Sequence, residues 1–399
     1  MITRWRPSAP AVLVGWCATR VLILVQLLIW ADNFLPDVRL YSTWTILLSD
    51  RQFPVGDAYW QYPPGAGVLF ALSRFAGPDS VFGFVVLAFL ADLALLLLLL
   101  SAGRGQSGER RFSGAWAWVI GGLAVGPVLV ARFDIFPTVF AVAAVLFATK
   151  PVRSGVMAAI GALLKVWPIL MLAVISRRQL PKAAIAAIVT ALVGVLGINA
   201  WASGGISFLG EQSERGLQIE SVGSLPYMIA GALGFEQNVV LRYGAYEFVM
   251  SGVGIIGLAI TAIGLLLFAT IAVLRLAGRL EQTPPGDIAL ALILIAVASS
   301  RVFSPQYDIW IVGLGAACIA DPRTRLRKVV IALIVMSAVT SVIFPWAYGS
   351  LMETAPYAVA LQVIRIVLLV ACTYIAVKSV VFSRHDSVQA QESEPGLSR

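Results

Sequence analysis

Apolar stretches of about 20 residues recur along most of this chain, and they constrain its fold more than any other feature. A stretch of that length is long enough to cross the roughly 30 Å hydrocarbon core of a bilayer as a helix. Only 13% of the residues are charged, about half the share usual in a soluble domain. Unbroken apolar runs such as Leu93 to Leu100 exclude the alternating pattern of a membrane β-barrel. The sequence therefore predicts an all-α polytopic membrane protein.

Basic residues concentrate in every second connection between the apolar stretches. Such connections stay on the cytoplasmic side under the positive-inside rule. The rule predicts about ten spans and places both termini in the cytoplasm. We therefore expect a multi-pass protein of the plasma membrane, with one transmembrane domain over residues 1–381 and a disordered cytoplasmic tail over residues 382–399. The net charge of +8 follows from these connections and does not indicate a nucleic-acid partner.

Residue types that bind metals are sparse and scattered. The single histidine, His385, lies in the polar tail, and Cys17, Cys318 and Cys372 fall in apolar stretches. Their spacing fits neither a metal site nor a disulfide framework. The sequence therefore predicts no metal centre, and it excludes a histidine-based catalytic site.

Two polar loops lie on the predicted outer side, at about residues 31–79 and 201–243. The part of the first loop from Ala31 to Gly67 holds four aspartates, several aromatic residues and the run Tyr62-Pro63-Pro64-Gly65. An acidic, aromatic loop between apolar spans indicates chemistry at the membrane surface. Structural roles are also open to these aspartates: Asp37, for instance, could cap an amphipathic helix predicted over Val38 to Leu48.

One apolar stretch, from Ser154 to Ile175, has basic residues beyond both ends and cannot span the membrane under the positive-inside rule. Lys165-Val-Trp-Pro168 interrupts it, and a proline bends or ends a helix. We predict two half-helices that enter and leave on the same side, with Lys165 at their tip facing a polar cavity. A lysine at that depth costs about 2.5–3.5 kcal/mol, so an anionic partner such as a phosphate is expected.

Further charged clusters occur at the predicted outer ends of later spans. They are Arg132-Phe-Asp-Ile-Phe-Pro137, Arg301-Val-Phe-Ser-Pro-Gln-Tyr-Asp308 and a weaker one at Glu214 to Ser221. A cavity that combines such cations with a carboxylate would suit a phosphate-bearing ligand and proton transfer. Two simpler interpretations stay open: Arg132 and Asp134 could form an interfacial ion pair, and Arg301 and Asp308 could extend toward the membrane surface.

Four other charged residues, Arg20, Arg365, Asp92 and Glu247, fall inside predicted spans. Arg20 and Glu247 are expected to make polar contacts between helices. Asp92 could face the interior of the bundle, and the sequence assigns it no role.

The clusters, in this order, resemble the GT-C superfamily of polytopic glycosyltransferases. More narrowly, they are similar to the actinobacterial polyprenyl-phosphate-mannose-dependent mannosyltransferases of the DUF2029, or GT87, type. The resemblance covers about residues 9 to 380. The motifs that carry it are Asp37 with Tyr41, Gln61-Tyr-Pro-Pro-Gly65, Arg132-Phe-Asp-Ile-Phe-Pro137, Leu164-Lys-Val-Trp-Pro168 and Phe303-Ser-Pro-Gln-Tyr307.

The resemblance implies a GT-C-like helical bundle with an outer-face catalytic loop and an inverting glycosyltransferase activity. Such an enzyme moves a sugar, here mannose, from a polyprenyl-phosphate donor to a glycolipid or glycan acceptor, without metal or cofactor. Asp37 matches the position of the general base. Lys165, Arg301 and Arg132 are the candidates for binding the donor phosphate. Relatives can place a histidine near that phosphate, and this chain has none in the membrane, so one of these cations would take its place. Further substrate-binding candidates are Tyr41, Tyr62, Asp134, Arg215, Glu220, Gln306 and Tyr307.

Other functions stay open at this stage. The broken pair of half-helices also resembles the discontinuous helices of transporters or lipid flippases, although no internal two-fold repeat accompanies it. A non-catalytic scaffold is a third possibility. Within the glycosyltransferase hypothesis, the donor sugar could be arabinofuranose instead of mannose.

Overall fold

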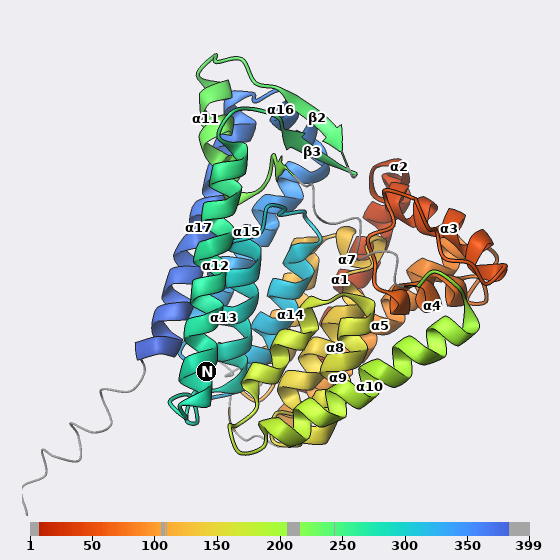
Figure 1. The fold of residues 1–399 in the computed structure, drawn as a ribbon, viewed down its shortest axis with the longest axis vertical. Coiled ribbons are helices and arrows are strands. Elements are labelled where there is room, and N and C mark those ends of the chain that lie inside the picture. The colour runs from red at the N-terminus through yellow and green to blue at the C-terminus, as the bar shows by residue number, and fades with distance from the viewer. Residues whose placement is uncertain (1–7, 105–107, 109, 206–215, 243, 383–399) are drawn as a thin grey trace, which may run out of the picture.

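The computed structural model describes residues 8–104, 108, 110–205, 216–242 and 244–382 of the chain, and these residues fold into a bundle made mostly of helices (Figure 1). Six helical segments within them are long and apolar enough to cross a membrane. They are α1 (Ala9–Ile29), α5 (Ser80–Arg104), α10 (Leu180–Trp201), α12 (Val253–Leu276), α17 (Pro356–Phe382), and the continuous segment Arg327–Met352 that joins α15 (Arg327–Val342), η4 (Ile343–Ala347) and α16 (Tyr348–Met352). The predicted helical, multi-pass membrane fold is confirmed.

Shorter apolar helices fill the centre of the bundle. They are α6 (Ser113–Val125), α8 (Ile135–Leu146), α9 (Pro151–Leu164), α13 (Pro285–Ala298) and α14 (Tyr307–Ala320). Almost every residue of α13 and α14 is buried, because protein instead of lipid surrounds them. A 14-residue helix rises only about 21 Å, less than a full crossing. The predicted count of about ten spans is therefore not confirmed.

The break predicted at Lys165 is present. Helix α9 ends at Leu164, Lys165 has an extended backbone, and the 3₁₀ helix η1 (Trp167–Val174) follows. A Cβ on Gly161 would lie only 2.7 Å from Pro168 Cβ, so the two limbs pack closely against each other. This hairpin carries Lys165 to the end of the bundle that bears α3 and α4, which we call the site end.

The first polar loop folds into three helices at the site end, α2 (Ala31–Phe34), α3 (Pro36–Ser49) and α4 (Pro64–Ser73), and α7 (Val128–Ala131) lies to their left in Figure 1. Helix α3 starts with proline at its first position, where the missing amide costs nothing. It is amphipathic as predicted, and its buried face includes Val38, Tyr41, Trp44 and Leu48. Asp37 lies in the first helical turn and makes no capping bond, so the capping interpretation was wrong.

The second polar loop contains strands that an all-α fold did not anticipate. Strands β1 (Leu217–Gln218), β3 (Ala245–Phe248) and β2 (Val239–Arg242) form an antiparallel sheet in that order. The 3₁₀ helix η3 (Val222–Ser224) and helix α11 (Leu225–Ala232) lie between β1 and β2. Helix α12 starts only at Val253, so the loop predicted to end at about residue 243 extends further along the chain. Glu247 belongs to β3, where its carboxylate accepts a hydrogen bond from Gly216 N at 2.9 Å, and not to a contact between helices.

A buried ion pair joins α1 to α5. Arg20 donates through Nε and Nη2 to the two carboxylate oxygens of Asp92, at 2.8 and 2.7 Å. Trp16 and Trp118 add indole N–H donors to the same carboxylate. The expected interhelical role of Arg20 is confirmed, and Asp92 is its partner. This bidentate, fully hydrogen-bonded geometry is what allows both charges to be buried.

We predict that Asp92→Ala lowers the free energy of unfolding by about 3–5 kcal/mol, because it leaves the Arg20 guanidinium buried without a counter-charge. Thermal unfolding of the detergent-solubilised protein measures this loss. Asp32→Ala is the matched control, since Asp32 pairs with Arg39 but its side chain is 89% exposed. It should cost no more than about 1 kcal/mol. Equal losses for the two variants would contradict the prediction.

Candidate active site

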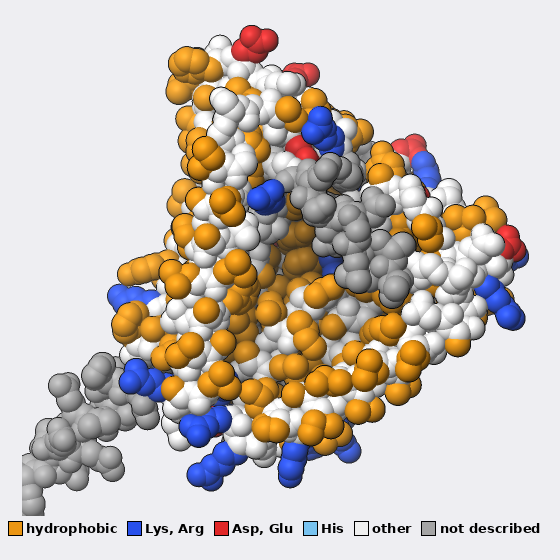
Figure 2. All heavy atoms as spheres, in the orientation of Figure 1, with side chains coloured by type: hydrophobic (Ala, Val, Ile, Leu, Met, Phe, Trp, Pro, Cys, Tyr) orange, Lys and Arg blue, Asp and Glu red, His pale blue; other side chains and the backbone are white. Residues whose placement is uncertain are grey.

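A polar cavity of about 450 Å³ at the site end brings distant parts of the sequence together. Its lining comes from α3 and the residues before α4, from the break after α9, and from the connection before α14. Figure 2 shows the molecule hollowed between the α12–α14 side and the α3–α4 side. The lining includes seven residues that the sequence selected: Asp37, Tyr41, Tyr62, Lys165, Arg301, Gln306 and Tyr307.

Asp37 faces this cavity with Arg132 behind it. The Arg132 Nε atom lies 3.0 Å from Asp37 Oδ2, and the Asp37 side chain is 40% exposed while that of Arg132 is 8% exposed. Arg132 Nη1 also donates to the carbonyl oxygens of Phe34 and Ala131, at 2.8 Å each. The guanidinium is therefore held by the backbone and orients the Asp37 carboxylate. Arg132 itself does not appear among the residues that line the cavity.

Lys165 has the anionic partner that its burial requires. Its Nζ atom donates to Asp134 Oδ1 at 2.7 Å and lies 4.6 Å from the ring centroid of Trp310. Burial raises the pKa of the Asp134 carboxyl, and the Lys165 ammonium opposes that shift. Asp134 is nearly inaccessible, whereas Lys165 keeps 23% of its side-chain surface exposed. Arg132 and Asp134 thus each pair with a different residue, and not with each other.

Two tyrosine hydroxyls lie beside Asp37. The hydroxyl oxygens of Tyr41 and Tyr62 are 3.1 Å apart, and the Tyr41 ring stacks on Phe70 with centroids 4.6 Å apart. Burial, helped by the Asp37 carboxylate, raises the pKa of both phenols. Both therefore stay protonated at physiological pH and can donate hydrogen bonds to sugar or phosphate oxygens.

The run Tyr62-Pro63-Pro64-Gly65 sets the distance between these tyrosines and Lys165. Pro64 starts α4, and Gly65 lies against α9 so closely that an added Cβ would be 2.5 Å from Leu163 O. Only glycine permits this approach, because no real Cβ contact is that short. Tyr62 and Lys165 consequently border the same cavity. The turn before this run is fixed by the Asp57 carboxylate, which accepts hydrogen bonds from Trp44 Nε1 and Tyr59 N.

The connection before α14 supplies the wall opposite α3. Arg301, Ser304, Gln306 and Tyr307 all line the cavity. The Tyr307 ring stacks on that of Trp310, with centroids 4.0 Å apart. Arg301 runs alongside α12, where a Cβ on Gly257 would come within 3.1 Å of its Nε atom. Asp308 is buried in the first turn of α14, so it does not extend to the membrane surface as the simpler interpretation supposed.

Three of the selected residues that the structure describes do not line the cavity: Arg132, Asp134 and Glu220. Glu220 is buried and forms an ion pair with Arg365 of α17 at 2.8 Å. Burial raises the pKa of the Glu220 carboxyl, and the Arg365 guanidinium opposes that shift. Arg215 lies outside the described residues.

Other lining residues were not selected from the sequence. Trp44, Tyr59, Trp167 and Trp310 give the cavity aromatic walls. Two signals pointed to them: Trp167 is part of the break motif, and Trp310 follows Tyr307 by three residues, on the same side of a helix. Within the described residues, no group of three or more His, Cys, Asp or Glu side chains could hold a metal ion.

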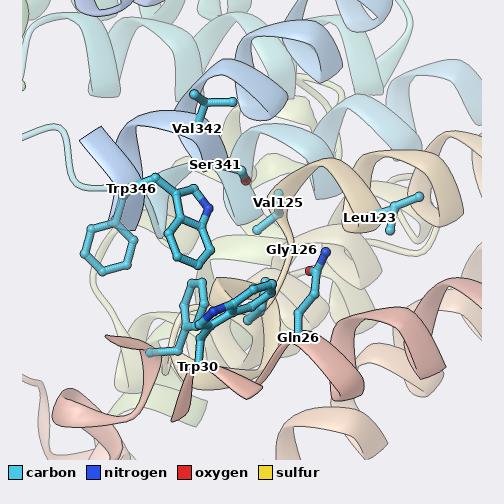
Figure 3. Close-up of a pocket in the computed structure, with 11 residues that line it drawn as sticks. Gln26, Trp30, Leu123, Val125, Gly126, Ser341, Val342 and Trp346 are labelled. Carbon is cyan, nitrogen blue, oxygen red and sulfur yellow. The ribbon is translucent and has the colours of Figure 1, made fainter. Parts of the chain in front are cut away.

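A second cavity, of about 480 Å³, lies on the other side of Arg132 and is mostly apolar. Trp30 and Trp346 approach each other across it, edge to face, with ring centroids 4.8 Å apart (Figure 3). Phe34 and Phe344 also line it. Arg132 bonds to Phe34 O and lies over the Phe344 ring at 5.6 Å. The Arg132–Asp37 ion pair therefore stands between a polar and an apolar cavity.

Comparison with known proteins identifies the family. Residues 60–305 match the model of glycosyltransferase family 87. The chain belongs to glycosyltransferase family 87. It is therefore a multi-pass membrane glycosyltransferase, and the matched region contains Tyr62, Arg132, Asp134, Lys165 and Arg301.

Among solved structures, the crystal structure of ArnT from Cupriavidus metallidurans in the apo state is similar, with a TM-score of 0.48 and 13% sequence identity. The similarity covers 92% of this chain and 78% of that one. No protein with a curated function matches the sequence.

We predict that Gly65→Ala lowers both stability and the rate of sugar transfer. The added methyl group would displace α4 from α9, which costs about 1–3 kcal/mol and separates Tyr62 from Lys165. Gly197→Ala is the matched control, because that helical glycine has open space at its Cβ position. It should be neutral or stabilising by up to about 1 kcal/mol. Unfolding temperature and initial transfer rate measure the two effects, and an inert Gly65→Ala would refute this account of the motif.

Proposed function

We propose that this family 87 enzyme transfers mannose, with inversion, from a polyprenyl-phosphate donor to a glycolipid or glycan acceptor at the outer face of the plasma membrane. The observation that carries the proposal is the shared cavity of Asp37, Lys165 and Arg301. It combines a half-exposed carboxylate with two cations, and it leaves room for a sugar between them. A proton acceptor for the acceptor hydroxyl and positive charge for the donor phosphate are what such a transfer needs.

The reaction is a single displacement. The acceptor hydroxyl gives its proton to the Asp37 carboxylate while its oxygen forms a bond to the anomeric carbon. The bond from that carbon to the phosphate oxygen breaks, and its electron pair stays on the polyprenyl phosphate. Lys165 and Arg301 stabilise the negative charge that develops there. A phosphate leaves readily as an anion, so the displacement needs no general acid.

Arg132 receives a different role from the one the sequence suggested. Its Nε atom is committed to Asp37 and its Nη1 atom to backbone carbonyls. We therefore assign it to holding the base in place, and we leave phosphate binding to Lys165 and Arg301. We expect the tyrosine pair Tyr41 and Tyr62 to bind sugar hydroxyls from one wall of the cavity and Gln306 to bind them from the opposite wall.

The apolar cavity gives the lipid part of a substrate a place beside the site. Its walls come from α1, α2, the α6–α7 connection and the end of α15. A lipid chain lying there would bring its polar head to the Arg132–Asp37 pair. This arrangement supports a lipid-linked substrate over a soluble nucleotide sugar.

The distribution of charge supports an outer-face site. Basic residues follow α5, η1 and α14 in connections at the end opposite the cavity. Figure 2 shows several Lys and Arg side chains at the lower edge, and visible Asp and Glu at the upper and right edges. Loops rich in Lys and Arg stay in the cytoplasm, so the cavity would face outward.

We predict that Asp37→Asn lowers the transfer rate by about 10²–10⁴-fold, the usual contribution of a general base. The measurement uses membranes supplied with radiolabelled polyprenyl-phosphate-mannose and follows label in the acceptor. Asp32→Asn is the control, since that exposed aspartate pairs with Arg39 away from the cavity. Turnover of Asp37→Asn at the wild-type rate would exclude Asp37 as the base.

We predict that the roles of Lys165 in folding and in catalysis can be separated. Lys165→Met should lower the free energy of unfolding by up to about 3 kcal/mol. This value is the lower end of the usual cost of breaking a buried ion pair, because Lys165 is partly exposed. Lys165→Met/Asp134→Leu removes both charges and should recover most of that stability. Transfer should stay low in the double variant, because the phosphate still lacks its cation. Recovery of the transfer rate together with stability would show that Lys165 is only structural.

The donor sugar is tested by comparison. We expect transfer from polyprenyl-phosphate-mannose to exceed that from the arabinofuranose analogue. Mass spectrometry of envelope glycolipids and glycans from a deletion strain should show a species that lacks one hexose. Loss of a pentose instead would change the assigned sugar while preserving the reaction type.

A further inference from the structure

Gln218 of β1 makes an unusual set of hydrogen bonds to the Arg301 connection. Its backbone N–H donates to Arg301 O at 3.0 Å. Its side-chain Oε1 accepts from Phe303 N at 2.7 Å, and its Nε2 donates to Ser304 Oγ at 3.2 Å. Three hydrogen bonds thus join one buried glutamine to Arg301, Phe303 and Ser304 of the connection that borders the cavity.

The same glutamine is fixed from the other side by a buried ion pair. Gln218 Nε2 donates to Glu220 Oε2 at 2.9 Å, and the other Glu220 oxygen pairs with Arg365 Nη1 at 2.8 Å. Arg365 Nη2 donates in turn to Phe303 O at 3.3 Å, and its guanidinium lies 3.8 Å from the Phe303 ring centroid. Gln362 completes the network by donating to Glu220 O at 2.7 Å. The connection is therefore held between the small sheet and α17.

We propose that Gln218 is a positioning residue for the donor-phosphate wall of the cavity, held in register by Glu220 and Arg365. The proposal rests on the proposed function, in which Arg301 binds the phosphate. Gln218 is not part of the cavity lining and touches no substrate. Its effect passes through Arg301 and Ser304, whose backbone and hydroxyl it contacts.

The chemistry of the site explains why position 218 holds a glutamine. Phe303 N requires an acceptor, while Glu220 requires a donor, and both groups are buried. An amide side chain provides one of each. A glutamate at 218 would place a second carboxylate against that of Glu220, and a methionine would remove the acceptor for Phe303 N and the donor to Glu220 Oε2.

Exchanging the side chains of Gln218 and Glu220 tests the proposal. Gln218→Met and Gln218→Glu should each raise the KM for the polyprenyl-phosphate donor by about 10- to 100-fold, the usual effect of leaving a buried polar group unpaired. Gln218→Glu/Glu220→Gln keeps the net charge and keeps an acceptor for Phe303 N and for Arg365 Nη1, while the hydrogen bonds from position 218 to Ser304 Oγ and to position 220 reverse their direction. It should return the KM to within a few-fold of wild type. Gln237→Met, a glutamine outside the cavity and the network, is the control and should leave the KM unchanged.

Hydrogen exchange measured by mass spectrometry provides a readout that does not need the reaction. Amides of residues 300–304 should exchange faster in Gln218→Met than in wild type, and slowly again in the swap variant. Unchanged exchange and unchanged KM in Gln218→Met, or a swap that restores neither, would overturn the proposal. If the wild-type protein transfers no sugar from a polyprenyl-phosphate donor, the proposed function fails. The exchange experiment then still decides whether Gln218 holds the connection.

Discussion

The pairing of enclosed charges is the constraint on which the rest of this structure depends. A membrane bundle cannot bury an isolated ammonium or carboxylate without a large cost. Lys165 and Asp134 meet at 2.7 Å, and Arg132 meets Asp37 at 3.0 Å. The short turn from Arg132 to Asp134 therefore holds two elements: Asp134 binds Lys165 at the α9 break, and Arg132 binds Asp37 at the start of α3. The cavity exists because these two pairs fix its walls.

Much of the helical architecture could be predicted from the sequence because hydrocarbon length and basic connections act locally. The break at Lys165 was also predictable, since a lysine and a proline inside an apolar stretch leave few alternatives. The small sheet was not, because strands of two to four residues carry almost no periodic signal. Helices α13 and α14 resemble membrane spans in the sequence, because a helix surrounded by protein and a helix surrounded by lipid are rich in the same apolar residues.

The candidate site was predictable as a set of residues but not as a set of contacts. Asp37 and Glu220 are both acidic residues in predicted outer loops, and the sequence does not distinguish their roles. Folding leaves Asp37 in the cavity and buries Glu220 against Arg365, nearly 150 residues further along the chain. Arg132 could pair with either Asp37 or Asp134, and no sequence spacing decides between them. Gln218 lies within the weaker cluster at Glu214 to Ser221 but was not selected from it, since its importance comes from partners that only the tertiary fold brings together.

The position of the Arg132–Asp37 pair between two cavities has a wider consequence. On one side lie tyrosine hydroxyls, cations and room for water; on the other lie Trp30, Phe34, Phe344 and Trp346. The Arg132–Asp37 ion pair thus forms a boundary between a polar and an apolar compartment inside the protein. An amphiphile could settle across that boundary with its tail still solvated by apolar groups. Under the proposed function, the fold would work like a phase-transfer catalyst, because an apolar lipid chain and a polar sugar would meet at one ion pair while each keeps its preferred surroundings.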